Sequence, residues 1–354
     1  MTSMTTTTTT ATITPTPPIT GPAFQFVEEI DACQLGDIGG FGARTQPLLV
    51  KGALHQWPAQ QQWSFEQMAA LRYRDGSEPV IKFQNGLVEQ GQTRPRPDMP
   101  IGPYLRELAA SAGRPSGEEA GLLPLHRKRA LMTAAAAAGA TAPFHLDWSY
   151  MQSFTPDRMY LAQWNILDEF PALRRDFAIK NLWPGRRWTW EYVFVGPAHT
   201  VTGLHYDFPH NWFCQVRGTK EFILFTPDQS PHLSVAKKYD WGATLSEVDI
   251  SRLDGQPGVR ERFAQARGLY ARVEAGDALF IPKRTWHAVV ALEPSISIGI
   301  FGLTPGEILI GGGIATARDL LHRVHLYRWG NCTCHKALPG RGVDPRGGSL
   351  DALE

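Results

Sequence analysis

The pattern of hydrophobic and polar positions changes near Met159, where short strand-like segments begin to follow one another. These segments are rich in Val, Ile, Phe, Tyr and Trp and are separated by Gly, Pro and Asp: RMYLAQWNI, TWEYVFVG, VTGLHYD, NWFCQVRG, KEFILFTP, LYARVEAG, DALFIP, HAVVALE and SISIGIFGL. Such composition is typical of β-strands. Many short strands with little helix between them predict a mainly β fold, with a closed or sandwiched antiparallel sheet.

Mixed patterns flank this β region. Upstream, QPLLVKGALHQWPA (46–59) and EPVIKFQ each predict a strand, and IGPYLRELAASAG predicts a helix that ends at Gly113. WSFEQMAAL predicts a helix with Ser64 as its N-cap. Downstream, residues 305–327 predict one or two helices, because apolar residues recur there at helical spacing: Ile308, Leu309, Leu320, Leu321 and Val324.

Segments of biased amino-acid composition indicate the domain boundaries. Residues 1–22 form a Thr/Pro-rich segment that cannot build a core, so we expect a disordered tail. One folded domain is expected over residues 23–304, with a surface insertion at 114–142 that is mobile unless a partner orders it. A C-terminal helical segment (305–335) and a loose tail (336–354) follow it.

Composition narrows the classes of function. The 354 residues are 43% hydrophobic and carry a net charge of +1, which gives no reason to expect nucleic acid or an anionic membrane as a partner. Four cysteines do not make a disulfide framework in a chain of this length, so a reducing compartment is expected. The N-terminus lacks the basic start and apolar stretch of a secretory signal, and no apolar run reaches transmembrane length. These features predict a cytoplasmic protein.

The stretch TGLHYDFPHNWFCQVRGTKEFILF (202–225) carries the strongest chemical signal. His205 and Asp207 are two positions apart in a predicted strand, so both side chains point to one face. Polar groups on a buried face need a partner. A His–Asp hydrogen bond would be one answer, and two ligands of a metal would be another.

A third ligand comes from GDALFIPKRTWHAVVAL, where His287 follows an Ile-Pro turn at the head of a strand. Two His and one Asp leave adjacent coordination positions open, which is the facial arrangement of non-haem Fe(II) oxygenases. Zinc more often completes its shell with Cys and His. The sequence therefore predicts an iron site made by His205, Asp207 and His287.

Lys220 extends this constellation. It begins the apolar run KEFILF, just after a predicted hairpin turn at Gly218-Thr219. A lysine at such a position is rarely buried without an anion, although an edge-strand lysine that reaches solvent is the simpler interpretation. A dicarboxylate bound to the metal at one end would present its far carboxylate to such a lysine. The hydroxyl of Thr202 could assist.

These residues resemble the JmjC-type oxygenases that use Fe(II) and 2-oxoglutarate, and in particular the cupin-like branch with protein asparaginyl and arginyl hydroxylases. The resemblance covers about Pro47 to Leu303 and includes PLLVKGALHQWPA and YLAQWNILDEFPAL. It implies a double-stranded β-helix, or jelly-roll, barrel. It also implies that His205, Asp207 and His287 bind the iron and act in catalysis. The implied 2-oxoglutarate residues are Lys220, Thr202, Tyr160 and Asn211.

Two other clusters compete with this site. FHLDW contains a second His-x-Asp pair, His145 and Asp147, without a lysine or distal His at comparable spacing. This pair is not expected to bind the metal, although it could face the entrance of the site. The C-terminal segment gathers residues that could bind a structural zinc or could be a surface cluster: His322, His325, Cys332, Cys334 and His335.

The resemblance implies a hydroxylase that uses O2, converts 2-oxoglutarate to succinate and CO2, and acts on a C–H bond of a protein or peptide side chain. A free amino acid or natural-product intermediate is the alternative substrate. A non-catalytic cupin-like binding protein is the alternative from another class. The apolar residues of 305–327 also predict a homodimer through the C-terminal helices.

Overall fold

The computed structural model describes residues 21–37, 44–81, 84–85, 99–112, 121–123, 143–153, 159–178, 182–183, 188–240, 243–329 and 332. Its strands are β1 (Ala23–Phe26), β2 (Glu28–Asp31), β3 (Leu48–Lys51), β4 (Val80–Ile81), β5 (Gln84–Asn85), β6 (Met99–Pro100), β7 (Met159–Trp164), β8 (Trp188–Gly196), β9 (Val201–Asp207), β10 (His210–Arg217), β11 (Lys220–Phe225), β12 (Ala243–Leu245), β13 (Arg267–Val273), β14 (Ala278–Ile281), β15 (Trp286–Ala291) and β16 (Ser295–Leu303). Its α-helices are α1 (Ala59–Gln62), α2 (Phe65–Ala69), α3 (Ile101–Ala112), α5 (Ile166–Glu169), α7 (Pro257–Phe263), α8 (Pro305–Glu307) and α9 (Gly313–Arg323), with a π-helical turn η7 (Ile308–Gly312) between the last two. Short 3₁₀ helices are η1 (Ala32–Asp37), η3 (Trp148–Ser153), η4 (Pro171–Asp176), η5 (Pro227–His232) and η6 (Leu253–Gly255).

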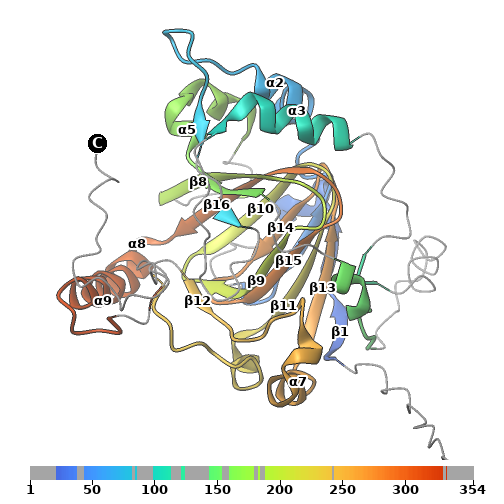
Figure 1. Cartoon of the computed structure of the whole chain (residues 1–354), viewed down its shortest axis with the longest axis vertical. Helices are drawn as coiled ribbons and strands as arrows, with labels where there is room; N and C mark the ends of the chain where they lie inside the picture. Colours follow the sequence, from blue (N-terminus) through green and yellow to red (C-terminus); the bar gives the residue numbers. More distant parts are fainter. Residues whose placement is uncertain are drawn as a thin grey trace, which may run out of the picture.

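Two large sheets face each other and form the barrel seen in Figure 1. One has the order β1-β13-β11-β15-β9-β12 and the other β2-β3-β14-β10-β16-β8-β7-β5. From β8 to β11, and again from β13 to β16, successive strands alternate between the two sheets. This alternation is the jelly-roll arrangement, so the predicted mainly β fold is confirmed.

The turn between β10 and β11 differs from the prediction in one respect. A hairpin was expected at Gly218-Thr219, but β10 and β11 lie in different sheets, so this turn crosses from one sheet to the other. Gly218 has a φ of +74°, and a Cβ at this position would lie 2.3 Å from the carbonyl oxygen of Pro294. Glycine is therefore required where the chain changes sheets.

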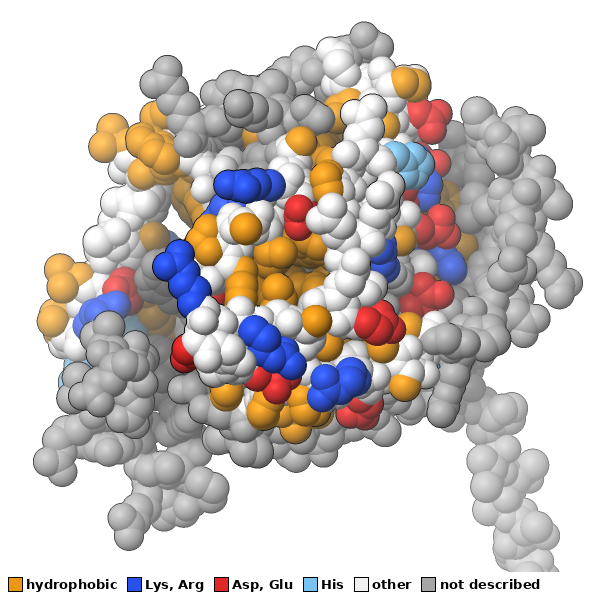
Figure 2. Space-filling view, turned by 90° about the horizontal axis from the view of Figure 1, so that it is seen from above, with side chains coloured by type: hydrophobic (Ala, Val, Ile, Leu, Met, Phe, Trp, Pro, Cys, Tyr) orange, Lys and Arg blue, Asp and Glu red, His pale blue; other side chains and the backbone are white. Residues whose placement is uncertain are grey.

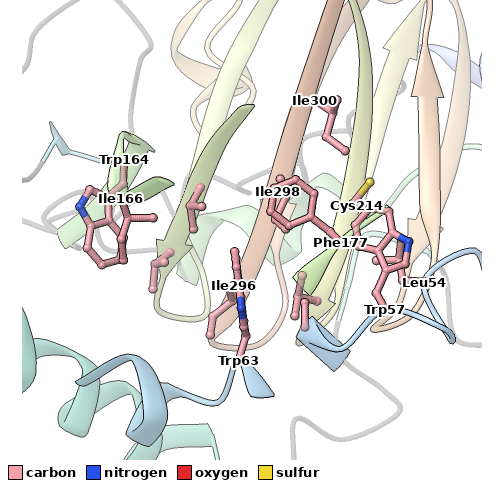
Figure 3. Packing of buried hydrophobic residues seen from close by; sticks show 14 of the residues in the cluster. Leu54, Trp57, Trp63, Trp164, Ile166, Phe177, Cys214, Ile296, Ile298 and Ile300 are labelled. Atoms are coloured by element: carbon pink, nitrogen blue, oxygen red, sulfur yellow. The ribbon is translucent and has the colours of Figure 1, made fainter. Parts of the chain in front are cut away.

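The outer face of the larger sheet is covered by α1, α2, α3 and α5, three of which Figure 1 labels above the barrel. Figure 3 shows this core, in which Trp63, Ile296 and Ile298 lie among other buried hydrophobic side chains. Strand β10 places Trp212 and Cys214 in this cluster, while Phe213 points to the barrel interior. Because both faces are covered, seven of the eight residues of β10 are buried.

The interior of the barrel is apolar at one end, where side chains of both sheets meet: Val27, Leu49, Phe213, Phe222, Leu224, Ala271, Val273, Leu279, Ile281 and Val289. A second cluster covers the outer face of the smaller sheet and includes Leu204 of β9. Figure 2 shows a hollow with hydrophobic side chains on its floor and charged side chains around its rim.

Several predicted elements outside the barrel are present. Ser64 accepts a hydrogen bond from the backbone of Gln67 and caps α2 as expected. Within the predicted insertion 114–142, the described residues 121–123 are buried, and the backbone N–H of Leu122 donates to the buried carboxylate of Glu221. This part of the insertion is therefore docked on the barrel. Residues 1–20 and 333–354, which include most of both predicted tails, lie outside the described residues.

Candidate metal centre

Two neighbouring strands bring the three predicted ligands together. His205 and Asp207 lie on β9, and His287 lies on β15, which pairs antiparallel with β9. The register sets His287 directly opposite His205, and the two imidazole centroids are 4.2 Å apart. Leu204 and Tyr206, which alternate with the ligands along β9, pack on the other side of the sheet.

The candidate ligand atoms of His205, Asp207 and His287 all lie within 4.8 Å of one another. His287 Nε2 is 3.6 Å from Asp207 Oδ2. This is the only group of three or more His, Cys, Asp or Glu side chains with such spacing in the part of the chain that the structure describes. Such a group can hold one divalent cation.

Backbone carbonyls fix the tautomer of both histidines. His205 Nδ1 lies 2.8 Å from the carbonyl oxygen of Gly203, and His287 Nδ1 lies 3.0 Å from that of Thr285. A carbonyl oxygen only accepts, so each Nδ1 carries the proton. Both Nε2 atoms therefore keep a lone pair, as metal-binding histidines require.

Burial favours the neutral forms of the metal-free site. It lowers the pKa of His287 to about 3, with a further contribution from neighbouring His205, so this imidazole is uncharged at neutral pH. Burial also raises the pKa of Asp207, an effect that His205 opposes and Asp240 reinforces. A bound dication would add an opposite charge beside this partly buried carboxylate. The donor set and its electrostatics thus fit a metal ion.

Lys220 lies in the same barrel interior. It begins β11, four residues before Leu224, which pairs with His287 of β15. Its side chain is only 1% exposed, and its Nζ has no hydrogen-bond partner among the described residues. Burial lowers its pKa to about 7. An unpaired buried ammonium is costly, so an anion that enters the interior would gain a partner here.

Of the other predicted co-substrate residues, Tyr160 lies beside this ammonium and Thr202 contacts Tyr160. The Nζ of Lys220 lies 5.5 Å from the ring centroid of Tyr160. The Tyr160 hydroxyl is hydrogen-bonded to the side chain of Thr202. Asn211 is buried on β10, and its Oδ1 has no hydrogen-bond partner among the described residues. Two polar atoms therefore stand unpaired in the interior, as expected of a pocket for a polar ligand.

The sequence reasoning missed Phe213, whose ring centroid lies 5.1 Å from Lys220 Nζ. The signal was present, because Phe213 is two positions after Asn211 and shares its face of the strand. It also missed the carbonyls of Gly203 and Thr285. Each belongs to the residue two positions before a histidine, but nothing in the sequence marks a carbonyl as a partner.

The competing His-x-Asp pair lies elsewhere. His145 Nδ1 is 3.1 Å from the carbonyl oxygens of both Gly21 and Pro22. Asp147 Oδ1 accepts hydrogen bonds from the backbone N–H and the hydroxyl of Ser149. Both side chains are exposed, and they do not belong to the group of candidate metal ligands.

The C-terminal His/Cys cluster is described only in part. His322 is buried, and its Nδ1 lies 2.7 Å from the carbonyl oxygen of Tyr327. His325 stacks on Trp329. Among the described residues, His322, His325 and Cys332 do not form a candidate metal group. Cys334 and His335 lie outside the described residues, so both alternatives for this cluster, a structural zinc and a surface cluster, stay untested.

The predicted C-terminal helices are present as α8, η7 and α9. Their exposed apolar residues, with those of the turn that follows, are Leu309, Ile310, Ile314, Leu320, Leu321, Val324 and Leu326. Within the described residues, no helix combines the length and hydropathy that spanning a bilayer requires.

The homodimer through the C-terminal helices stays a prediction. We expect a dimeric mass by light scattering at micromolar concentration, and a monomeric mass would contradict it.

Comparison with known proteins gives the class. The family model of the cupin-like domain matches residues 40–301, which is well over half of the chain. The chain therefore belongs to the cupin-like domain family. The match includes the candidate ligands and the residues around Lys220.

Individual relatives include proteins with Jumonji or JMJ names and a tRNA-modification protein. The chain is 31% identical over 153 residues to Jumonji C domain-containing protein 5 of Drosophila melanogaster, which covers 40% of the chain and 36% of the relative. It is 31% identical over 167 residues to lysine-specific demethylase JMJ30 of Arabidopsis thaliana (42% and 34%). It is 29% identical over 138 residues to tRNA wybutosine-synthesizing protein 5 of Gallus gallus (39% and 41%). The chain thus spans about a third to two fifths of the length of these curated relatives.

Proposed function

We propose that this protein is an Fe(II)- and 2-oxoglutarate-dependent oxygenase that hydroxylates a C–H bond of a protein or peptide side chain. The donor set supports iron, because two imidazoles and one carboxylate on adjacent strands leave coordination positions open for other ligands. Membership of the cupin-like domain family supports the same chemistry.

In this proposal His205, Asp207 and His287 hold the iron through two Nε2 atoms and a carboxylate oxygen. With 2-oxoglutarate and O2, the iron supplies the oxidising chemistry that yields succinate, CO2 and one hydroxylated product. The protein residues contribute orientation. The Gly203 and Thr285 carbonyls hold the imidazole rings, and the apolar interior excludes water from the reaction.

One observation carries the proposal: the buried, unpaired ammonium of Lys220 in the same interior as the three candidate ligands. It would pair with the distal carboxylate of 2-oxoglutarate in a charge-assisted hydrogen bond. The hydrogen-bonded pair Tyr160–Thr202 would border that carboxylate, and the Oδ1 of Asn211, which has no hydrogen-bond partner in the described part of the chain, would be available beside it. A non-catalytic binding protein has no need of both a metal set and an unpaired cation.

A cavity beside β8 is a candidate for binding part of a larger substrate. Its volume is about 410 Å³ and it is lined by Asn165, Asp168, Arg174, Thr189, Trp190, Glu191 and Tyr192. The Trp190 ring stacks on Phe301, which pairs with Asn211 across β16 and β10. Through Trp190 and Phe301, one edge of the cavity is thus linked to β10. A free amino acid or natural-product intermediate is the alternative substrate.

Iron-dependent formation of succinate tests the function. The purified protein would be supplied with Fe(II), 2-oxoglutarate and O2, together with separate pools of cell-extract protein, peptides and small metabolites. We expect one pool to stimulate succinate release and to yield a product heavier by one oxygen atom. Absence of both 2-oxoglutarate binding and iron-dependent succinate release would favour the non-catalytic alternative. Stimulation by the metabolite pool alone would reassign the substrate.

A further inference from the structure

The C-terminal helices contact the chain directly after Asp207 and shortly before His287, two of the candidate metal ligands. We use the name C-terminal helical segment for residues Pro305–Arg323, which form α8, η7 and α9. In Figure 1 this segment lies at the side of the barrel, close to β12. One of its contacts reaches the residue after Asp207, and the other reaches the turn before His287.

The first contact joins Gly311 to Phe208. A Cβ built on Gly311 would lie 1.7 Å from Cζ of Phe208, and two more atoms of that ring would lie within 2.7 Å of it. The phenyl ring therefore rests directly on the backbone of the segment. Gly311 belongs to the π-helical turn Ile308–Gly312, a rare geometry that is often found at functional sites. Phe208 immediately follows Asp207, so this packing links the segment to the end of β9.

The second contact centres on Glu307. Its carboxylate accepts hydrogen bonds from the backbone and the hydroxyl of Thr304, both at 2.8 Å, and from Lys283 Nζ at 2.7 Å. It also lies 3.3 Å from His210 Nε2. The backbone N–H of Lys283 donates to His210 Nδ1, so Nδ1 is the acceptor and Nε2 carries the proton toward Glu307. The carboxylate thus joins α8, β10 and the turn before β15.

That turn determines the position of His287. The backbone N–H of Arg284 donates to the carbonyl of Asp207, and that of Thr285 donates to the carbonyl of Pro282. Arg284 has a φ of +60°, a conformation that non-glycine residues adopt only when their surroundings impose it. The carbonyl of Thr285 then accepts from His287 Nδ1. Displacement of Lys283 would therefore be transmitted to the imidazole.

We infer that the C-terminal helical segment is a positioning element of the metal centre. It sets Asp207 through the Gly311–Phe208 packing, and it sets His287 through the hydrogen bonds of Glu307 with Lys283 and His210. This inference rests on the proposed function, in which Asp207 and His287 bind the iron. Phe208, Glu307 and Gly311 touch no reacting group and act only through the ligands.

Two glycine substitutions two residues apart test it. Gly311→Ala adds a methyl group that collides with Phe208, whereas a Cβ at Gly313 meets nothing within 4 Å. Both replace glycine by alanine in the same helical segment, so their effects on helix propensity are matched. The measurements are the dissociation constant for Co(II), the absorption spectrum of the Co(II)-loaded protein, and the melting temperature of each metal-free variant.

We expect Gly311→Ala to weaken Co(II) binding about tenfold, which is the lower end of the effect of residues that support metal ligands, and to alter the Co(II) spectrum. Gly313→Ala should match the unchanged protein in both. Adding Phe208→Ala to Gly311→Ala removes the collision and should recover part of the affinity. If Gly311→Ala is unfolded, Glu307→Gln replaces it and should likewise change the spectrum.

The outcomes separate the two proposals. Absence of Co(II) binding by the unchanged protein would overturn both the metal centre and this inference. Normal Co(II) binding by the unchanged protein, with the same affinity and spectrum in folded Gly311→Ala or Glu307→Gln, would leave the metal centre standing. The C-terminal helical segment would then pack on the barrel without positioning the metal ligands.

Discussion

The chain contains two His-x-Asp motifs, and their surroundings differ completely. His145-Leu146-Asp147 and His205-Tyr206-Asp207 both alternate, so each motif presents its His and Asp on one side of the chain with a hydrophobic residue between them. The side of His145 and Asp147 is exposed and bonds to nearby backbone and to Ser149. The side of His205 and Asp207 faces another histidine inside a barrel.

This difference shows that spacing alone does not make a metal site. Both motifs satisfy the same-face rule. Only the second lies in a strand whose neighbour supplies a third ligand at the matching register. Only the second shares an interior with an unpaired cation. The two motifs therefore serve as matched test and control for the proposed chemistry.

The largest contrast is expected in metal binding. Asp207→Ala removes one of the three candidate ligands, so we expect stoichiometric Fe(II) or Co(II) binding and succinate formation to be lost. Asp147→Ala removes the same side chain from the other motif and should leave both unchanged. Metal analysis of the purified variants and anaerobic titration with Co(II) measure the difference.

Full activity in Asp207→Ala would refute the site. So would a stoichiometric metal that persists when His205, Asp207 and His287 are all replaced. Loss of metal in Asp147→Ala as well would mean that the two motifs are equivalent, and the comparison would fail. Circular dichroism of each variant separates loss of a ligand from loss of the fold.

The fold was largely predictable because its signals are local. Short segments rich in β-branched and aromatic residues identified the strands, and the capping residue Ser64 identified α2. The sequence did not reveal that Gly218 and Thr219 join strands of different sheets, because a hairpin and a crossing turn use the same residue types. Sheet membership depends on pairings between residues far apart in the chain, which no local pattern records.

The candidate site was predictable where its residues are chemically distinctive. His205, Asp207, His287 and Lys220 are residue types that are costly to bury, so their positions in apolar strands drew attention. The supporting contacts were not predictable. The fit of Phe208 against Gly311 and the carbonyl partners of the two histidines depend on backbone positions that only the folded chain defines.

The next contrast concerns Lys220, the cation that shares the barrel interior with His205 and Asp207. Lys220→Met keeps the length of the side chain and removes the charge, so the distal carboxylate of 2-oxoglutarate would lose its partner. Such charge-assisted bonds contribute roughly 1.5–3 kcal/mol, and leaving the carboxylate unpaired can cost more, so the Michaelis constant for 2-oxoglutarate should rise about ten- to a few hundred-fold. Titration of 2-oxoglutarate against succinate release measures it.

Two controls sharpen this prediction. Metal affinity should stay unchanged in Lys220→Met, because Lys220 is not among the candidate ligands. Lys220→Arg should restore only part of the affinity, since its wider planar fork does not fit a pocket shaped for an ammonium group. An unchanged Michaelis constant in Lys220→Met would show that the lysine does not bind the co-substrate.

A smaller, graded contrast follows from the pKa of Lys220. Burial lowers that pKa to about 7 in the protein without co-substrate. Below pH 7 the ammonium is already charged and 2-oxoglutarate binds without proton uptake. Above pH 7 a proton must be taken up on binding, so affinity should fall by up to about tenfold per pH unit. Calorimetry at several pH values should show this slope in the unchanged protein and none in Lys220→Met.

The smallest contrast is in stability: Asp147→Ala should destabilise the protein, whereas Asp207→Ala should not. Asp147 Oδ1 accepts hydrogen bonds from the backbone N–H and the hydroxyl of Ser149 at the start of η3. Asp147→Ala removes this cap, so we expect the free energy of unfolding to fall by roughly 0.5–2 kcal/mol. Asp207 is a partly buried carboxylate whose pKa is raised by its burial, so the metal-free protein disfavours its charge. Replacing it by Ala removes that charge, so the metal-free protein should be at least as stable as before. Chemical denaturation in the presence of a chelator measures the stability of both variants. Equal destabilisation by the two substitutions would mean that Asp207 stabilises the metal-free fold.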